Sequence, residues 1–185
     1  MTDISPVSVP GSMEQKAAER GTTEQKYRTL TLLLIKKGLT ISTMESCTGG
    51  LLASLLTDTE GSSAAFRGSY VTYSNAEKIR LGVPAQIIKS YGVYSPQTAN
   101  AMAQVCAKAF GTDIGIGVTG TFTNADPANS DSVPGEVFFS IYGNAINGNG
   151  RPRDCNCTVP ALPSRHACKL RVADMIADRL LEILR

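Results

Sequence analysis

Hydrophobic and polar positions change their period along the chain, and each change marks a predicted element. From Glu24 onward, apolar residues recur at helical spacing until the run Lys36-Lys37-Gly38, which is typical of a helix end. Residues 39–44 then alternate with the two-residue period of a strand. A glycine-containing turn at 45–50 follows and leads into a short apolar helix over 51–56. The first part of the chain is therefore predicted to alternate helix and strand.

The alternation continues downstream, but it is not strict. Predicted helices cover 76–81, 84–90, 96–110, where Pro96 opens the helix, and 163–184. Predicted strands cover 69–74, 114–118, 137–142 and 155–159. The alternation predicts an α/β protein, and the segment 137–159 has room for two adjacent strands, so the sheet is not expected to be wholly parallel. Its expected architecture is a three-layer α/β/α sandwich with a mixed sheet.

Two segments lack any apolar period. Residues 1–22 are rich in Ser, Thr, Pro and Gly, which predicts a flexible N-terminal tail ahead of one domain over 23–185. Residues 119–135 are polar and carry Gly and Pro between two predicted strands. A loop of that length inside a compact domain is usually functional, so this loop is expected to border a site.

Composition narrows the setting of the protein. The 18 Lys and Arg against 16 Asp and Glu give a net charge of +2, which predicts no dense basic face and no nucleic-acid partner. No apolar run is long enough for a membrane span, and the N-terminus has no apolar signal-peptide core. An odd number of cysteines, 5, favours reduced thiols over a disulfide framework. A cytoplasmic protein without a membrane partner is expected.

The turn at 45–50, Glu-Ser-Cys-Thr-Gly-Gly, is the most informative stretch for chemistry. Ser46 is expected near the N-cap of the following helix, where backbone N–H groups without internal partners can bind a phosphate or an oxyanion. Glycines there would let a ligand approach the backbone. The alternative is that Ser46 only caps an ordinary helix.

A nucleophilic serine needs a base, and two candidates differ in kind. The single histidine, His166, starts the last predicted helix, and nothing in the spacing brings it to Ser46, so a solvated histidine is the simpler interpretation. A desolvated lysine is the other option. Tyr73 and Asn75 lie at a predicted strand end, with Lys78 about one helical turn further on, although a plain strand end with a solvated lysine fits as well.

Cysteines offer two competing sites. Cys47 adjoins Ser46 and could itself be a nucleophile, but alternation along the turn favours a buried small residue. Cys155, Cys157, His166 and Cys168 superficially form a zinc set. Their spacing does not match the usual paired ligands, so no metal is predicted.

The sequence also resembles a known family, the CinA C-terminal domain family, from about Glu24 to the C-terminus. The resemblance rests on an ordered set of motifs: residues 45–50, Gly61-Ser62-Ser63 with Phe66, residues 71–75, Lys78, Leu81-Gly82-Val83, residues 92–95, Thr119-Gly120, and residues 134–137. It implies an anticodon-binding-like sandwich, usually a homo-oligomer. The implied activity is hydrolysis of the carboxamide of nicotinamide mononucleotide to nicotinate mononucleotide and ammonia, with no cofactor.

The resemblance also assigns roles by position. It implies that Ser46 is the nucleophile, that Lys78 with Tyr73 activates it, and that the reaction passes through an acyl-enzyme. Around the substrate it places Thr48, Gly49 and Gly50 as backbone donors, Thr119 and Gly120 on the opposite wall, and Arg165 for the phosphate. Asn75 is also expected to bind the substrate.

One segment departs from the family pattern. The family commonly has Thr-Gly-x-Ala-Gly-Pro after the predicted strand at 114–118, whereas this chain continues from Thr119-Gly120 with Thr-Phe-Thr-Asn-Ala-Asp-Pro over 121–127. Phe122 is expected to narrow or reshape the pocket. Two alternatives therefore stand beside the amidase: a catalytically silent domain that binds a nucleotide or a protein, and an amidase for another carboxamide.

Overall fold

The computed structural model describes residues 13–129, 132–143 and 153–185, and for 13–20 it gives the course of the backbone alone. The helices are α1 (Met13–Lys37), α2 (Leu51–Thr57), α3 (Asn75–Arg80), α4 (Ala85–Tyr91), α5 (Pro96–Phe110) and α7 (Arg165–Leu184), with a 3₁₀ turn at Ser62–Ala64. The strands are β1 (Ile41–Glu45), β2 (Phe66–Val71), β3 (Ile114–Gly120), β4 (Glu136–Tyr142) and β5 (Arg153–Thr158).

Within the described residues, five strands form one mixed sheet in the order β2-β1-β3-β4-β5. The first three neighbours are parallel, and β4 and β5 join antiparallel, which confirms the predicted mixed sheet. The register places Glu45 opposite both Val71 and Val118. The carboxyl ends of β1, β2 and β3 therefore lie level, and the segments that follow these strands meet at one edge of the sheet, where α/β proteins usually bind ligands.

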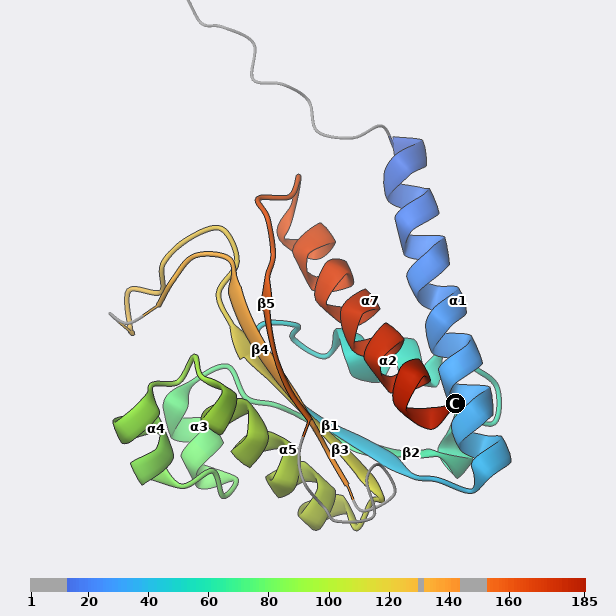
Figure 1. The fold of residues 1–185 in the computed structure, drawn as a ribbon, viewed down its shortest axis with the longest axis horizontal. Coiled ribbons are helices and arrows are strands. Elements are labelled where there is room, and N and C mark those ends of the chain that lie inside the picture. Colours follow the sequence, from blue (N-terminus) through green and yellow to red (C-terminus); the bar gives the residue numbers. More distant parts are fainter. Residues whose placement is uncertain (1–12, 130–131, 144–152) are drawn as a thin grey trace, which may run out of the picture.

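Helices cover both faces of the sheet (Figure 1). α1, α2 and α7 lie on one face, and α3, α4 and α5 lie on the other. Strand β3 serves both layers, because its isoleucines belong to the core under α1 and α7 while its glycines face α5. A Cβ at Gly117 would lie 2.0 Å from the Ala99 carbonyl oxygen, so only glycine allows α5 to pack this closely.

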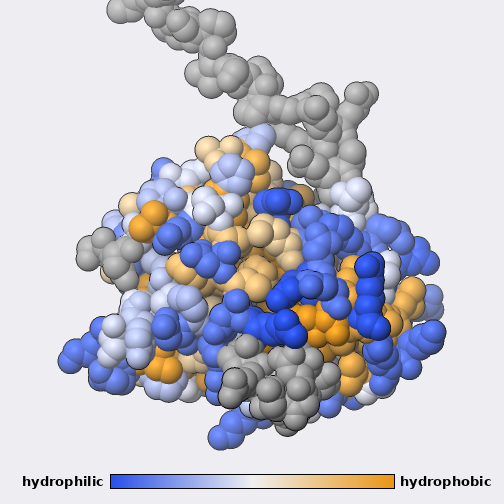
Figure 2. Space-filling view, viewed as in Figure 1, coloured by the Kyte–Doolittle hydropathy of each residue, from blue (hydrophilic) through white to orange (hydrophobic). Residues whose placement is uncertain are grey.

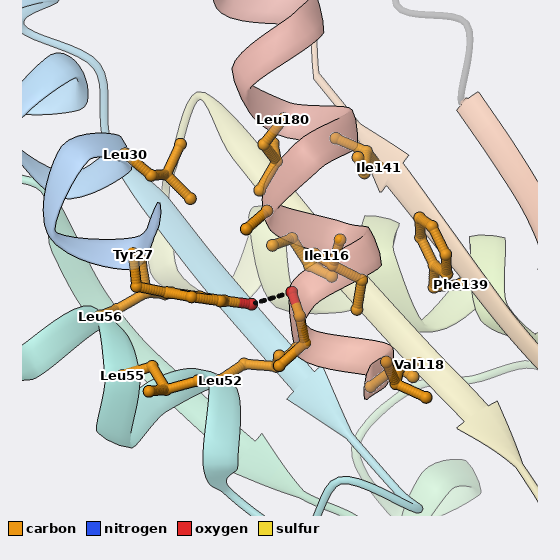
Figure 3. Close-up of a cluster of buried hydrophobic side chains, with 14 of the residues drawn as sticks. Tyr27, Leu30, Leu52, Leu55, Leu56, Ile116, Val118, Phe139, Ile141 and Leu180 are labelled. Atoms are coloured by element: carbon orange, nitrogen blue, oxygen red, sulfur yellow. Dashed lines mark hydrogen bonds between the residues drawn. The ribbon is translucent and has the colours of Figure 1, made fainter. Parts of the chain in front are cut away.

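The main core lies between the sheet and the layer of α1, α2 and α7 (Figure 3). Its one polar tip in that view is Tyr27, whose hydroxyl donates to the Ala173 carbonyl at 3.1 Å and so ties α1 to α7. Lys26, next along α1, pairs with Asp174 and Asp178 of α7 at 2.8 Å each. The two terminal helices are thus joined by both apolar and polar contacts.

The surface carries mixed polarity. Figure 2 shows hydrophilic residues over much of the displayed face, with smaller apolar areas between them. Among the described residues, no helix combines the length and apolar character that crossing a membrane requires.

Most boundaries differ from the sequence-based expectation by one or two residues, and two elements differ by more. α1 begins at Met13, inside the segment predicted as a flexible tail, whose first twelve residues lie outside the described ones. Residues 13–20 consist of Met, Glu, Gln, Lys, Ala and Arg, which all favour helix, without any apolar period. The second strand covers Phe66–Val71 rather than 69–74, so Tyr73 follows the strand instead of belonging to it.

Candidate active site

A cavity of about 510 Å³ opens at the carboxyl ends of β1, β2 and β3. Its walls come from the turn after β1, the segment between β2 and α3 with the start of α3, the segment before α5, the end of β3 with the loop after it, and the first residue of α7. Most of the residues that the sequence or the resemblance singled out line it: Ser46, Tyr73, Asn75, Lys78, Gly120 and Arg165.

The structure brings Ser46 and Lys78 together although 32 positions separate them. The Lys78 Nζ lies 3.1 Å from the Ser46 Oγ and 2.9 Å from the Thr72 carbonyl oxygen. Lys78 is only 2% exposed, so its ammonium form loses nearly all contact with water. The lysine reaches Ser46 because it lies about one turn into α3, which begins shortly after β2.

Burial lowers the pKa of Lys78 from 10.5 to about 8, while the nearby Asp126 carboxylate opposes that shift. With a pKa of about 8, roughly a tenth of the amine is uncharged at pH 7. An uncharged amine at hydrogen-bond distance from a serine hydroxyl can accept the hydroxyl proton. The Thr72 carbonyl accepts one N–H of the amine, which orients the nitrogen.

The turn that carries Ser46 is organised by Glu45, not by Ser46. The buried Glu45 carboxylate accepts hydrogen bonds from the backbone N–H groups of Gly50 at 2.9 Å, Leu52 at 3.1 Å and Ala53 at 2.9 Å. It also accepts the Thr48 hydroxyl at 2.8 Å. The carboxylate thus acts as the cap of α2, because it accepts N–H groups that have no partner within the helix and places negative charge at the positive end of the helix dipole.

The alternative that Ser46 only caps an ordinary helix is therefore wrong. Gly50, in the left-handed region at φ 92°, is the N-cap residue of α2, four positions after Ser46. The predicted donors change as well, since the Gly50 N–H is bound to Glu45 and the Gly49 N–H to the Ser46 carbonyl at 3.1 Å. Among the described residues, no backbone or side-chain oxygen accepts the N–H groups of Cys47 and Thr48, and of these two residues Cys47 lines the cavity.

Tyr73 lies at the mouth of the cavity and is 64% exposed. Its hydroxyl accepts a hydrogen bond from the Arg165 guanidinium at 2.7 Å and makes none with Ser46 or Lys78. The structure therefore shows a direct contact between serine and lysine and no relay through the phenol. The Arg165 guanidinium also lies 5.1 Å from the ring centre of Phe122, in a cation–π contact.

Thr119 does not reach the cavity. It is fully buried, and its hydroxyl donates to the Val93 carbonyl at 3.1 Å, which fastens β3 to the segment before α5. The Thr48 hydroxyl is likewise bound to the Glu45 carboxylate, so both threonine side chains hold the fold together and neither is turned to a ligand.

Asn75 does line the cavity, and its side-chain amide donates to Asn129 at 2.8 Å.

Sequence reasoning missed a polar cluster in the loop after β3. The Asp126 carboxylate accepts the Tyr94 hydroxyl at 2.5 Å, the Asn129 amide at 2.6 Å and the Ala128 N–H at 2.9 Å. These donors lower the pKa of Asp126, and burial with this carboxylate raises the pKa of Tyr94. The Asp-Pro pair was a turn signal, but no local pattern links it to Tyr94, 32 residues away.

Residues 23–152 match the CinA C-terminal domain family. The chain belongs to this family. A protein of Clostridium acetobutylicum named "Putative competence-damage inducible protein" is 39% identical over 147 residues, which are 79% of this chain and 34% of that protein. A CinA-like protein of Dictyoglomus turgidum is 43% identical over 111 residues, which are 60% of this chain and 27% of that protein. The chain thus spans about a quarter to a third of the length of these relatives.

Solved structures of CinA proteins share the fold along almost their whole length. A competence/damage inducible protein of Agrobacterium tumefaciens superposes with a TM-score of 0.77 at 27% identity, covering 88% of this chain and 96% of that one. A CinA superfamily protein of Enterobacter cloacae gives a TM-score of 0.78 at 20% identity, covering 100% and 99%. The CinA α/β fold of this chain is therefore established, with its mixed sheet between two helical layers.

Of the competing residues, only Cys47 lines this CinA-family cavity. His166 is exposed and does not line the cavity. Cys47 borders it but is 2% exposed, and burial raises the pKa of its thiol to about 12, which keeps the thiol protonated. All five cysteines fall in described segments as free thiols, and no described group of three or more His, Cys, Asp or Glu is arranged to hold a metal ion.

Proposed function

We propose that this CinA-family protein is an amidase that hydrolyses the carboxamide of nicotinamide mononucleotide to nicotinate mononucleotide and ammonia. The observation that carries the proposal is the 3.1 Å contact between the buried Lys78 Nζ and the Ser46 Oγ. A serine with a lysine base is one of the known arrangements for acyl transfer. The choice of substrate rests on the family resemblance rather than on the contact.

The first half-reaction forms an ester. Uncharged Lys78 takes the Ser46 hydroxyl proton as the oxygen attacks the carboxamide carbon, and the carbonyl oxygen becomes an oxyanion. The Cys47 and Thr48 N–H groups follow directly after the nucleophile and are the donors that the turn leaves unused among the described residues. Removing one such donor in a serine hydrolase typically costs about 3 kcal/mol of transition-state stabilisation. When the oxyanion collapses, the C–N bond breaks and the leaving nitrogen takes the proton from Lys78, which gives ammonia.

The second half-reaction regenerates the enzyme. Water attacks the ester carbon while Lys78 accepts one of its protons, and collapse of this second intermediate breaks the bond to the Ser46 oxygen. Lys78 then returns the proton to Ser46, and the carboxylic acid product leaves. Splitting the hydrolysis in this way replaces one difficult attack on an amide by two easier steps.

Arg165 suits the phosphate of the nucleotide. Its guanidinium stands at the cavity mouth between Tyr73 and Phe122, which fix its plane through a hydrogen bond and a cation–π contact. A guanidinium with a fixed orientation can bind two phosphate oxygens at once. We assign this role to Arg165, and to Tyr73 the role of holding it.

Ammonia release from nicotinamide mononucleotide tests the proposal. The wild type should turn over, whereas Ser46→Ala and Lys78→Met should lose at least about a thousandfold in kcat, the scale expected for a nucleophile and its base. His166→Ala serves as the matched control and should keep full activity, because this histidine is exposed and outside the cavity.

Other outcomes discriminate between the alternatives. Tight binding of the nucleotide without turnover would support a silent binding domain. Turnover of other carboxamides alone would support an amidase with a different substrate. Phe122 would then be the first residue to examine, because it is buried in the cavity wall and departs from the common family pattern. An inactive His166→Ala variant with an intact fold would return the base role to the histidine.

A further inference from the structure

The cavity is lined by one acidic side chain, Asp126, among the described residues. The charged groups that share the wall are Lys78 and Arg165, both cationic. Asp126 belongs to the loop in which this chain departs from the common family pattern. Its negative charge is thus a feature of this particular pocket and is not needed for the contact between Ser46 and Lys78.

Three donors hold the Asp126 carboxylate in place. The Tyr94 hydroxyl and the Asn129 amide both bind Oδ2, at 2.5 and 2.6 Å, while the Ala128 N–H binds Oδ1 at 2.9 Å. Asn129 is itself held by Asn75 from α3, at 2.8 Å. The chain of contacts from α3 through the loop to Tyr94 fixes the carboxylate on the cavity wall with little freedom to turn away.

The carboxylate is ionised and has no ion-pair partner in the described part of the chain. Its donors are neutral and lower its pKa. No lysine or arginine of the described residues forms a salt bridge with it, although Lys78 is near enough to interact electrostatically. A fixed carboxylate at a cavity wall, hydrogen-bonded but without a salt bridge to a described residue, favours a cationic ligand group.

The proposed substrate carries such a group. In nicotinamide mononucleotide the ring nitrogen is bonded to ribose and is quaternary, so the ring bears a permanent positive charge, while the phosphate is anionic. The cavity offers a matching pair, a carboxylate in the loop after β3 and the Arg165 guanidinium at its mouth. We propose that Asp126 is a specificity residue that binds the cationic pyridinium ring and so selects N-glycosylated, charged carboxamides over uncharged ones.

This inference rests on the proposed function for the identity of the ligand, but binding tests it without turnover. The two probes are nicotinamide mononucleotide and its reduced dihydropyridine form. They share the ribose, the phosphate and the carboxamide, and differ mainly in the charge of the ring. Titration calorimetry with the Ser46→Ala variant measures both affinities while hydrolysis is blocked. The charged probe should bind about fivefold more tightly, the size typical of a partly solvated charge pair.

Asp126→Asn in the Ser46→Ala background should remove this preference. The affinity for the charged probe should fall about fivefold, and the affinity for the reduced probe should stay nearly unchanged. Tyr94→Phe removes one hydrogen bond to the carboxylate but keeps its charge, so the preference should persist. Asp58→Asn, which removes an exposed carboxylate outside the cavity, should change neither affinity.

Equal weakening of both probes by Asp126→Asn would overturn the proposal, because it would mean that Asp126 only positions the loop. Equal affinities in the Ser46→Ala parent would overturn it as well. If the wild type has no amidase activity, but the Ser46→Ala variant prefers the charged probe and Asp126→Asn removes that preference, the assignment to Asp126 is supported and the proposed hydrolysis is refuted.

Discussion

Replacing Lys78 by methionine should change the pH dependence of stability in a direction that only a buried, titrating amine explains. The amine is 2% exposed, and burial lowers its pKa from 10.5 to about 8. At pH 7 it is mainly protonated in the folded and unfolded chains alike, so folding must bury a charge. A shift of this size corresponds to a cost of about 3 kcal/mol.

The cost depends on pH in a defined way. It is full below the folded-state pKa of about 8, decreases as the pH rises toward 10.5, and disappears above 10.5, where the amine is uncharged in both states. Between pH 7 and pH 10 the free energy of unfolding of the wild type therefore rises by about 2 kcal/mol through this residue. Lys78→Met has no amine to titrate at this position, so it shows no such rise. The methionine variant also lacks the hydrogen bonds to Ser46 and Thr72, about 1 kcal/mol each, but that loss is the same at both pH values.

Thermal unfolding at the two pH values measures this difference. For a chain of 185 residues, 1 kcal/mol corresponds to roughly 2–4 °C in Tm, so the stability of Lys78→Met relative to wild type should fall by about 4–8 °C from pH 7 to pH 10. Lys89→Met, at an exposed position of α4, is the matched control and should show no such change. A Tm difference between Lys78→Met and wild type that is equal at both pH values would refute the buried, depressed amine.

Three further substitutions test other parts of the site. Glu45→Gln should lower the free energy of unfolding by about 3 kcal/mol in urea titrations, because an amide cannot accept all the donors at the start of α2, whereas exposed Glu60→Gln should have little effect. Arg165→Ala should raise KM for nicotinamide mononucleotide about tenfold with kcat within about threefold, and a fall in kcat alone would contradict its binding role. Gly117→Ala should destabilise the fold by about 3 kcal/mol in thermal unfolding, since its Cβ would overlap the Ala99 carbonyl, and an unchanged Tm would contradict that close packing.

Local signals predicted the secondary structure well where they were strong. The helix at 96–110 was predicted with the bounds that the structure shows, because Ser95 caps it, Pro96 occupies its first turn and Gly111 adopts the left-handed conformation at its end. The start of α1 was missed because its first turns favour helix through propensity alone, without the apolar period that marks the rest.

The site was predictable only in part, for a physical reason. A hydroxyl, two glycines and a following helix suggested a cap by Ser46, yet the acceptor that the helix uses is the carboxylate of the preceding residue, Glu45. The nearness of Lys78 to Ser46 was expected from the family resemblance alone. The contact arises from the parallel pairing of β1 and β2, which brings the segments after the two strands together. Sheet order cannot be read from either segment separately.

The polar cluster around Asp126 had no sequence signal of its own. Its members come from the loop after β3, from α3 and from the segment before α5, and they meet only because the carboxyl ends of the parallel strands lie level. The long polar loop at 119–135 was expected to border a site, and several of its described residues do line the cavity. Which of them would face inward depends on tertiary contacts that no period in the sequence encodes.

The pH profile of kcat/KM for ammonia release tests most directly whether uncharged Lys78 activates Ser46. Between about pH 6.5 and about pH 9.5 the rate should rise about tenfold per unit at first and level off above the Lys78 pKa of about 8, because the unprotonated amine is the active form. His166→Ala should leave that profile unchanged. A rate independent of pH over this range, or a pH dependence that vanishes in His166→Ala, would contradict the account.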